Sequence, residues 1–157
     1  MNVLRQKGLS LIEVMITLAV FSFGLLALAA LMASGLKYNT SALHRSHATS
    51  QAYDIADRMR ANRLGLDAGH YNGLSDSSDI PICVGFESDS EINCNPEQMA
   101  QYDSWEWNTD NARLLPEGAG TVRLKSVESG IYTITVAWND DRDPKTEADS
   151  FVFEFQP

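Results

Sequence analysis

Residues 9–36 form a long apolar run that contains one charged residue, Glu13, and no proline. About 20 apolar residues in a helix are enough to span the hydrocarbon core of a bilayer, so this run predicts a membrane-spanning helix. A short basic leader with Arg5 and Lys7 ends at Gly8, directly before the run. A secretory signal peptide has a shorter apolar core, with its cleavage site after that core. Here the leader and Gly8 precede the apolar run, as expected for a membrane anchor that stays on the chain when the leader is removed.

Beyond Leu36 the pattern changes from apolar to amphipathic. Apolar or small residues recur at helical spacing in a broken stripe: Leu36, Leu43, Ala48, Ala52, Ile55, Ala56 and Met59. This periodicity predicts that one continuous helix runs from about Ser10 to Leu64, apolar in its first half and amphipathic in its second. Gly65 follows a basic cluster and is predicted to cap the helix C-terminus.

The rest of the chain predicts a loop, a short helix and three strands. Residues 66–95 are rich in Gly, Ser and Asp, as expected for a long loop. Asn95 followed by Pro96 is typical of a helix start, and we expect a short helix towards Trp105. Alternating apolar residues then predict strands over 121–127, over 131–138 and around 151–155, with a turn at 115–120 and a hairpin turn at 128–130. The fold class expected is α+β, with the long N-terminal helix packed on a C-terminal antiparallel sheet.

Glu13 is the one charged residue in the apolar run, and its presence there is unexpected. A carboxylate in the middle of a bilayer costs about 2.5–3.5 kcal/mol on insertion scales, and such a group is usually functional. A carboxylate near the leader end could instead reach the headgroup layer and have no role. Its surroundings favour a role, because Lys7-Gly8-Leu9-Ser10-Leu11-Ile12-Glu13-Val14 resembles the class III signal of type IV pilins and type II secretion pseudopilins.

The resemblance implies how this N-terminus is processed and used. A membrane prepilin peptidase would cut between Gly8 and Leu9 and methylate the new amino terminus of Leu9. Glu13 would be the glutamate that docks the subunit by pairing with the amine of another subunit. The implied organisation is a leader over residues 1–8, a transmembrane and filament-core segment over 9–36, and an extracytoplasmic globular domain over 37–157.

Charge and cysteine content agree with a domain outside the cytoplasm. The chain has 12 basic and 21 acidic residues, and loss of the leader leaves a net charge of −11. Such an acidic protein lacks the clustered cations that nucleic-acid binding needs. The two cysteines, Cys83 and Cys94, favour a disulfide in that compartment. A metal site would need more soft ligands, and no cofactor is expected.

Other segments resemble the PilV group of minor pilins. They are Tyr53–Asn62, the two-cysteine loop, Leu115-Pro116-x-Gly118-x-Gly120 and Thr135-Val136-x-Trp138-x-Asp140. This resemblance implies a minor pilin that works with other minor pilins and the major pilin. It would prime pilus assembly, lie at or near the tip beside a large adhesin, and support adhesion and twitching motility. The subunit would be anchored in the inner membrane before assembly and would then enter the cell-surface pilus.

Several alternatives remain open at this point. A minor pseudopilin of the I type in a type II secretion system has the same anchor, and a signal-anchored periplasmic adhesin could use the 66–95 loop for binding. A periplasmic enzyme would need convergent polar groups, and no catalytic constellation is visible. His44 and His47 lie three residues apart without a third ligand. The acidic loop 139–149 lacks the spacing of an EF-hand, so we interpret it as a solvated turn rather than a calcium site.

Overall fold

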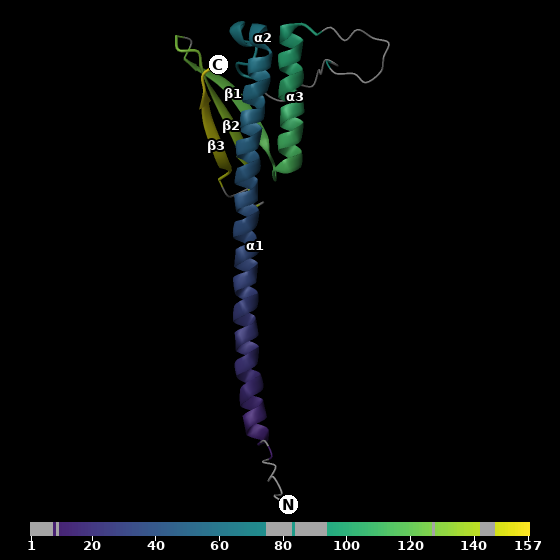
Figure 1. Cartoon of the computed structure of the whole chain (residues 1–157), viewed down its shortest axis with the longest axis vertical. Helices are drawn as coiled ribbons and strands as arrows, with labels where there is room; N and C mark the ends of the chain where they lie inside the picture. Colours follow the sequence, from purple (N-terminus) through teal and green to yellow (C-terminus); the bar gives the residue numbers. More distant parts are fainter. Residues whose placement is uncertain (1–7, 9, 75–82, 84–93, 127, 142–146) are drawn as a thin grey trace, which may run out of the picture. The chain divides into compact units, whose positions relative to one another are not determined.

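The computed structural model describes residues 8, 10–74, 83, 94–126, 128–141 and 147–157 (Figure 1). Its elements, in chain order, are α1 (Leu11–Ala61), α2 (Arg63–Asp67), α3 (Pro96–Leu114), β1 (Ala119–Ser126), β2 (Ile131–Trp138) and β3 (Asp149–Phe155). The expected α+β class is confirmed. The chain divides into two compact units, Met1–Thr40 and Ser41–Pro157, and the second unit is called the head below.

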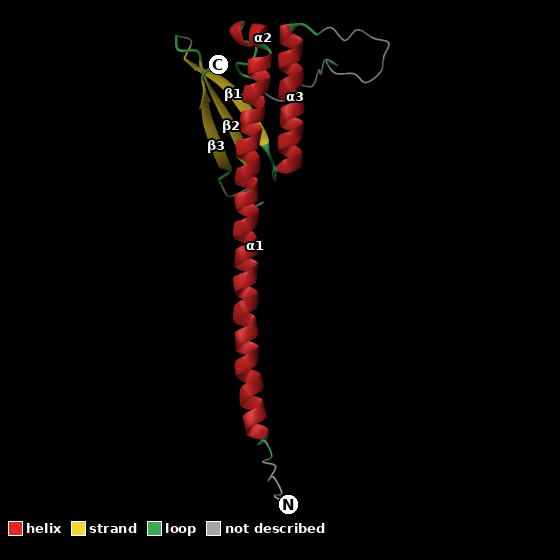
Figure 2. Ribbon diagram, viewed as in Figure 1, coloured by secondary structure: helices red, strands yellow, loops and turns green. Residues whose placement is uncertain are grey.

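The sheet in the head is antiparallel, with the strand order β1-β2-β3 (Figure 2). The predicted alternation along the middle strand is confirmed, since Tyr132, Ile134, Val136 and Trp138 are all buried. β1 begins at Ala119, two residues earlier than predicted, because its pairing with β2 already starts between Ala119 and Ala137. The sheet therefore presents one apolar face.

The amphipathic part of α1 lies on the core of the head. Its buried residues are Ala48, Gln51, Ala52, Ile55, Ala56 and Met59. All of them except Gln51 belong to one hydrophobic cluster with Trp107 of α3 and with the buried face of the sheet. The predicted stripe was too long at its start, because Leu36 and Leu43 are exposed. The small side chains at 48, 52 and 56 allow close packing of the helix on the aromatic residues of its partners.

The end of α1 differs from the prediction. The helix ends at Ala61, since Asn62 has φ −96° and ψ 63°, which are not helical values. The Asn62 side chain accepts a hydrogen bond from Gly65 N at 3.2 Å and donates one to Pro96 O at 2.7 Å. Gly65 is therefore not the cap of α1 but a buried residue within α2. A Cβ there would lie 2.8 Å from the Pro96 carbonyl oxygen, so the neighbouring backbone requires glycine.

α3 is longer than the sequence indicated, extending to Leu114 rather than towards Trp105. Its start was predicted well, because Asn95 and Gln98 form a capping box in which each side chain accepts a hydrogen bond from the other residue's backbone N–H. The continuation depends on tertiary packing: the Trp107 indole N–H donates to Gln51 O of α1 at 2.8 Å. Most residues after Trp105 are polar, so the sequence pattern did not indicate that this part of the helix has a buried face.

Candidate assembly interface

The N-terminal motif leads directly into α1. Gly8 is exposed, Leu9 lies outside the described residues, and Ser10 O accepts hydrogen bonds from Glu13 N at 3.0 Å and Val14 N at 3.2 Å. These bonds place Glu13 in the first helical turn, where a carboxylate is favoured by the positive end of the helix dipole. No described residue forms an ion pair with Glu13. The carboxylate is thus exposed in the single subunit.

The first part of α1 exposes apolar side chains along its length. Leu11 is 80% exposed, Phe21 66%, Phe23 72% and Leu31 69%. Within the described part of the chain, α1 is the one helix that is long and apolar enough to cross a membrane, judged by length and composition. So large an apolar surface is unfavourable in water, and lipid or other helices would cover it.

The hydroxyl groups in this stretch are compatible with lipid. Thr17 donates to Glu13 O at 2.8 Å, and Ser22 donates to Leu18 O at 2.7 Å. Ser34 and Thr40 make the same contact with the carbonyl four residues earlier. Because each of these four Ser and Thr hydroxyls is satisfied by the helix itself, none of the four requires water or a partner.

A charged network joins α1 to α3 in the head. Arg58 donates through Nε to Asp54 Oδ2 at 2.8 Å and through Nη1 to Glu106. Burial disfavours the guanidinium charge, but the hydrogen bonds to Glu106 and Asp54 outweigh it and raise the pKa of Arg58. The sequence suggested the pair with Asp54 four residues away. It gave no indication of Glu106, which is 48 residues distant in the chain.

Tyr71 and Asp103 extend this network into the core. The buried Tyr71 hydroxyl donates to Asp103 Oδ2 at 2.5 Å and accepts from Asn62 Nδ2 at 3.2 Å. Burial raises the pKa of Asp103, and the hydrogen bond from Tyr71 and the charge of Arg58 offset this in part. Burial and the same bond raise the pKa of Tyr71, so its hydroxyl remains the donor. The network fixes the Tyr53–Asn62 segment against α3.

His44 and the start of the acidic loop form a second polar contact. His44 Nδ1 is hydrogen-bonded to Asp140 Oδ1. Burial opposes ionisation of Asp140, but hydrogen bonds with Ser41 and His44 hold its pKa below the usual value. Among the residues with described positions, no group of three or more His, Cys, Asp or Glu side chains could hold a metal ion. Residues 142–146 of the acidic loop lie outside the described residues.

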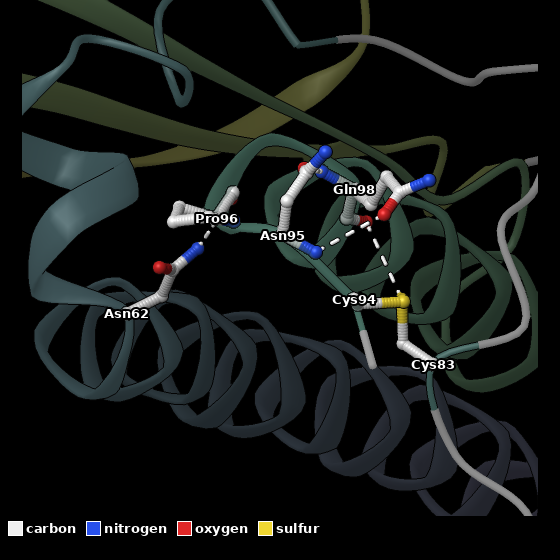
Figure 3. The surroundings of a disulfide bond; sticks show 6 residues. All are labelled: Asn62, Cys83, Cys94, Asn95, Pro96 and Gln98. Carbon is white, nitrogen blue, oxygen red and sulfur yellow. Dashed lines mark hydrogen bonds between the residues drawn. A yellow bond between two sulfur atoms is a disulfide. The ribbon is translucent and has the colours of Figure 1, made fainter. Parts of the chain in front are cut away.

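The structure joins Cys83 and Cys94 in a disulfide at the start of α3 (Figure 3). Cys94 immediately precedes the capping residue Asn95, and the Cys83 sulfur lies 3.7 Å from the Gln98 carbonyl oxygen. The bridge therefore attaches Cys83 to the same helix end that Asn62 of α1 contacts through Pro96 O.

Comparison with known families agrees with this arrangement. The model of the prokaryotic N-terminal methylation motif matches residues 4–29, and the model described as type IV pilin Tt1218 matches residues 30–105. No significant match was found among curated proteins or among solved structures. The chain is therefore a type IV pilin with a prepilin-type N-terminal motif, and the family-level prediction from the sequence is confirmed. Pilins are structural proteins rather than enzymes, and they assemble with other pilins.

Proposed function

We propose that this pilin is a minor subunit of a type IV pilus, which acts in assembly rather than catalysis. It joins other minor pilins to prime the filament, lies at or near the tip with a large adhesin, and supports pilus-dependent adhesion and twitching motility. Before assembly it is anchored in the inner membrane with its head on the periplasmic side. The methylation motif and the exposed apolar half of α1 support the anchoring and assembly of the subunit, and the minor role rests on the resemblance of Tyr53–Asn62 and of the two-cysteine loop to the PilV group.

The same residues define the steps of assembly. Prepilin peptidase removes residues 1–8 by cutting between Gly8 and Leu9, and it methylates the amine of Leu9. The apolar helix then leaves lipid for the filament core, where neighbouring helices cover it. Glu13 is costly in a bilayer without a cation. Pairing with the amine of the subunit docked ahead supplies that cation, so docking is favoured in one register.

Mass spectrometry of the membrane-extracted chain tests the processing step. The expected product begins at Leu9 and carries one additional methyl group. Replacing Gly8 with a bulky residue should leave the leader attached. A chain that still begins at Met1 in cells with active prepilin peptidase would exclude this cleavage.

Glu13→Ala tests docking, and Glu97→Ala is a matched control. Both carboxylates lie in the first turn of a helix, but Glu97 belongs to α3 in the head. Glu13→Ala should insert and be processed normally, because loss of a charge makes the helix easier to hold in lipid. It should then be absent from sheared pili, whereas Glu97→Ala is incorporated. Incorporation of Glu13→Ala at the wild-type level would contradict the charge-pairing account.

The minor role is tested by stoichiometry and by deletion. The subunit should be present in sheared pili in far fewer copies than the major pilin, and its deletion should abolish surface piliation while protein secretion continues. Loss of secretion with normal pili would instead identify a pseudopilin of a type II secretion system.

A further inference from the structure

The two edges of the sheet in the head are protected to different degrees. The β1 edge is covered by three hydrogen bonds: Gly73 N to Val122 O at 3.0 Å, Leu124 N to Asn72 Oδ1 at 2.9 Å and Gly120 N to Asn108 Oδ1 at 2.7 Å. β1 also carries the cations Arg123 and Lys125 and an irregular register between Leu124 and Ser126. Covering groups, cations and irregularities are the usual means by which proteins block an edge strand.

Among the described residues, none provides β3 with these protections. Its residues Asp149–Phe155 include no Lys, Arg or Pro, and they pair with β2 at seven consecutive positions without a shift. Because antiparallel pairing alternates, the amides and carbonyls of Ser150, Val152 and Glu154 point away from β2. No described residue bonds to these outward groups. β3 is the outer strand of the sheet, on the side away from α3 (Figure 2).

Apolar side chains lie on both faces of the sheet at this open edge, although Val152 is flanked by the exposed polar residues Ser150 and Glu154. Val152 is 56% exposed, and Tyr53 of α1 is 50% exposed. The Tyr53 ring lies 4.8 Å from the Phe153 ring, centroid to centroid. An added strand would therefore place one set of alternate side chains over Phe153 and Tyr53, and the other set beside Val152.

A cavity of about 290 Å³ lies at the beginning of β3. It is lined by Arg45, Trp138, Asp149, Ser150 and Phe151. The indole N–H of Trp138 has no hydrogen-bond acceptor among the described residues, although Trp138 is only 3% exposed.

We propose that β3 is a docking edge for an extended strand from a different protein of the pilus assembly. This strand has alternating apolar residues and a Lys or Arg at the end that lies beside Asp149. The cation follows from charge complementarity, because Asp149 and Glu154 are the only charged residues of β3 and Glu154 already pairs with Lys125 of β1. The proposal uses the family assignment but does not depend on the minor role.

A second copy of this chain is a poor occupant of the edge. Parallel pairing of two β3 strands would place Asp149 beside Asp149 and Glu154 beside Glu154, which is unfavourable. Antiparallel pairing reverses one head relative to the other. Within the head, α1 runs in the same direction as β3, since Arg45 lines a cavity with Ser150 and Arg60 lies 4.6 Å from the Phe155 ring centroid. The two copies of α1 would then run in opposite directions, which does not suit two subunits anchored in one membrane.

Hydrogen exchange of the full chain in detergent tests the proposal. The probes are a capped peptide, Lys-Thr-Val-Thr-Val-Thr-Lys, and a twin with Glu at both ends. In the free chain, the outward amides of Ser150, Val152 and Glu154 should exchange fast, while those of Phe151 and Phe153 are protected. The Lys peptide at about nine times its dissociation constant should slow the outward amides about tenfold, which corresponds to nine-tenths occupancy, and the Glu peptide at the same concentration should not.

Val152→Pro and Val152→Ala form a matched pair of variants. Both remove the exposed side chain, but only proline removes the outward N–H, and that N–H bonds to no residue of β2. Val152→Pro should unfold at the wild-type temperature yet lose the peptide protection, whereas Val152→Ala retains it.

Three results would overturn the proposal. The first is outward amides that are already protected in the free chain, and the second is the absence of protection by the Lys peptide. The third is protection that rises with chain concentration alone, which would identify a second copy as the occupant.

Discussion

Tyr71→Phe should destabilise the head through Asp103. The substitution removes one buried oxygen and keeps the ring, so it creates almost no cavity. It removes the 2.5 Å hydrogen bond to Asp103 Oδ2 and leaves the Arg58 guanidinium, 3.7 Å from Asp103 Oδ1, as the nearest cation. A hydrogen bond to a charged group contributes about 1.5–3 kcal/mol. We therefore expect a loss of about 2 kcal/mol, which for a domain of this size lowers the midpoint of thermal unfolding by about 8 °C.

The loss should depend on pH in a defined direction. The folded-state pKa of Asp103 lies above its usual value of 3.8, so its contribution to stability is full below that pH and declines as pH rises through the folded pKa. The Tyr71 hydroxyl opposes this shift. Its removal raises the pKa of Asp103 further, and the penalty of Tyr71→Phe should grow from about pH 4 to about pH 7.

Tyr132→Phe provides the control for this prediction. Tyr132 is also buried, and its hydroxyl donates to a neutral acceptor, Leu66 O, at 3.3 Å. Its loss should cost about 1 kcal/mol, with little change between the two pH values. Thermal unfolding of the full chain in detergent, followed by near-ultraviolet circular dichroism, measures both variants. Equal losses for the two variants, independent of pH, would refute the role assigned to the Asp103 carboxylate.

Two further predictions concern the disulfide and a glycine of β1. Replacing both Cys83 and Cys94 with Ala should cost about 3 kcal/mol, because the bridge closes a loop with a sequence separation of 11. Thermal unfolding with and without reductant measures this loss, and a wild-type midpoint that reductant leaves unchanged would contradict it. Gly120→Ala should cost about 1–3 kcal/mol, because a Cβ there overlaps the Trp107 ring, which is fixed by its hydrogen bond to α1. Gly35→Ala, which has open space around it, should not lower the midpoint, and equal effects of the two glycine variants would reject the overlap.

Elements with a strong local pattern could be predicted from the sequence. The apolar run after Gly8, the alternation along β2 and the Asn95-Pro96 helix start each depend on residues close together in the chain. Periodicity and capping are properties of such short segments, so the helix, the strand and the helix start are found where they were predicted. The prepilin motif is local in the same sense, and it identified the family.

Boundaries and polar partnerships depended on tertiary structure. Asn62 ends α1 and caps α2 through Gly65, and its side chain also donates to Pro96 O, which lies 34 residues away and which the sequence near Asn62 does not indicate. α3 continues past Trp105 because the indole of Trp107 reaches α1. Glu106, the partner of Arg58 on α3, lies 48 residues away in the chain.

The difference between the edges of the sheet is also a tertiary property. The sequences of β1 and β3 predict strands, but they do not state which edge the rest of the chain covers. Asn72 and Asn108 reach the β1 edge from segments outside the sheet, and none of the described residues does the same for β3. A strand's own pattern fixes which side chains face the core, whereas the groups that meet its backbone edge come from distant segments, and only the folded chain brings them there.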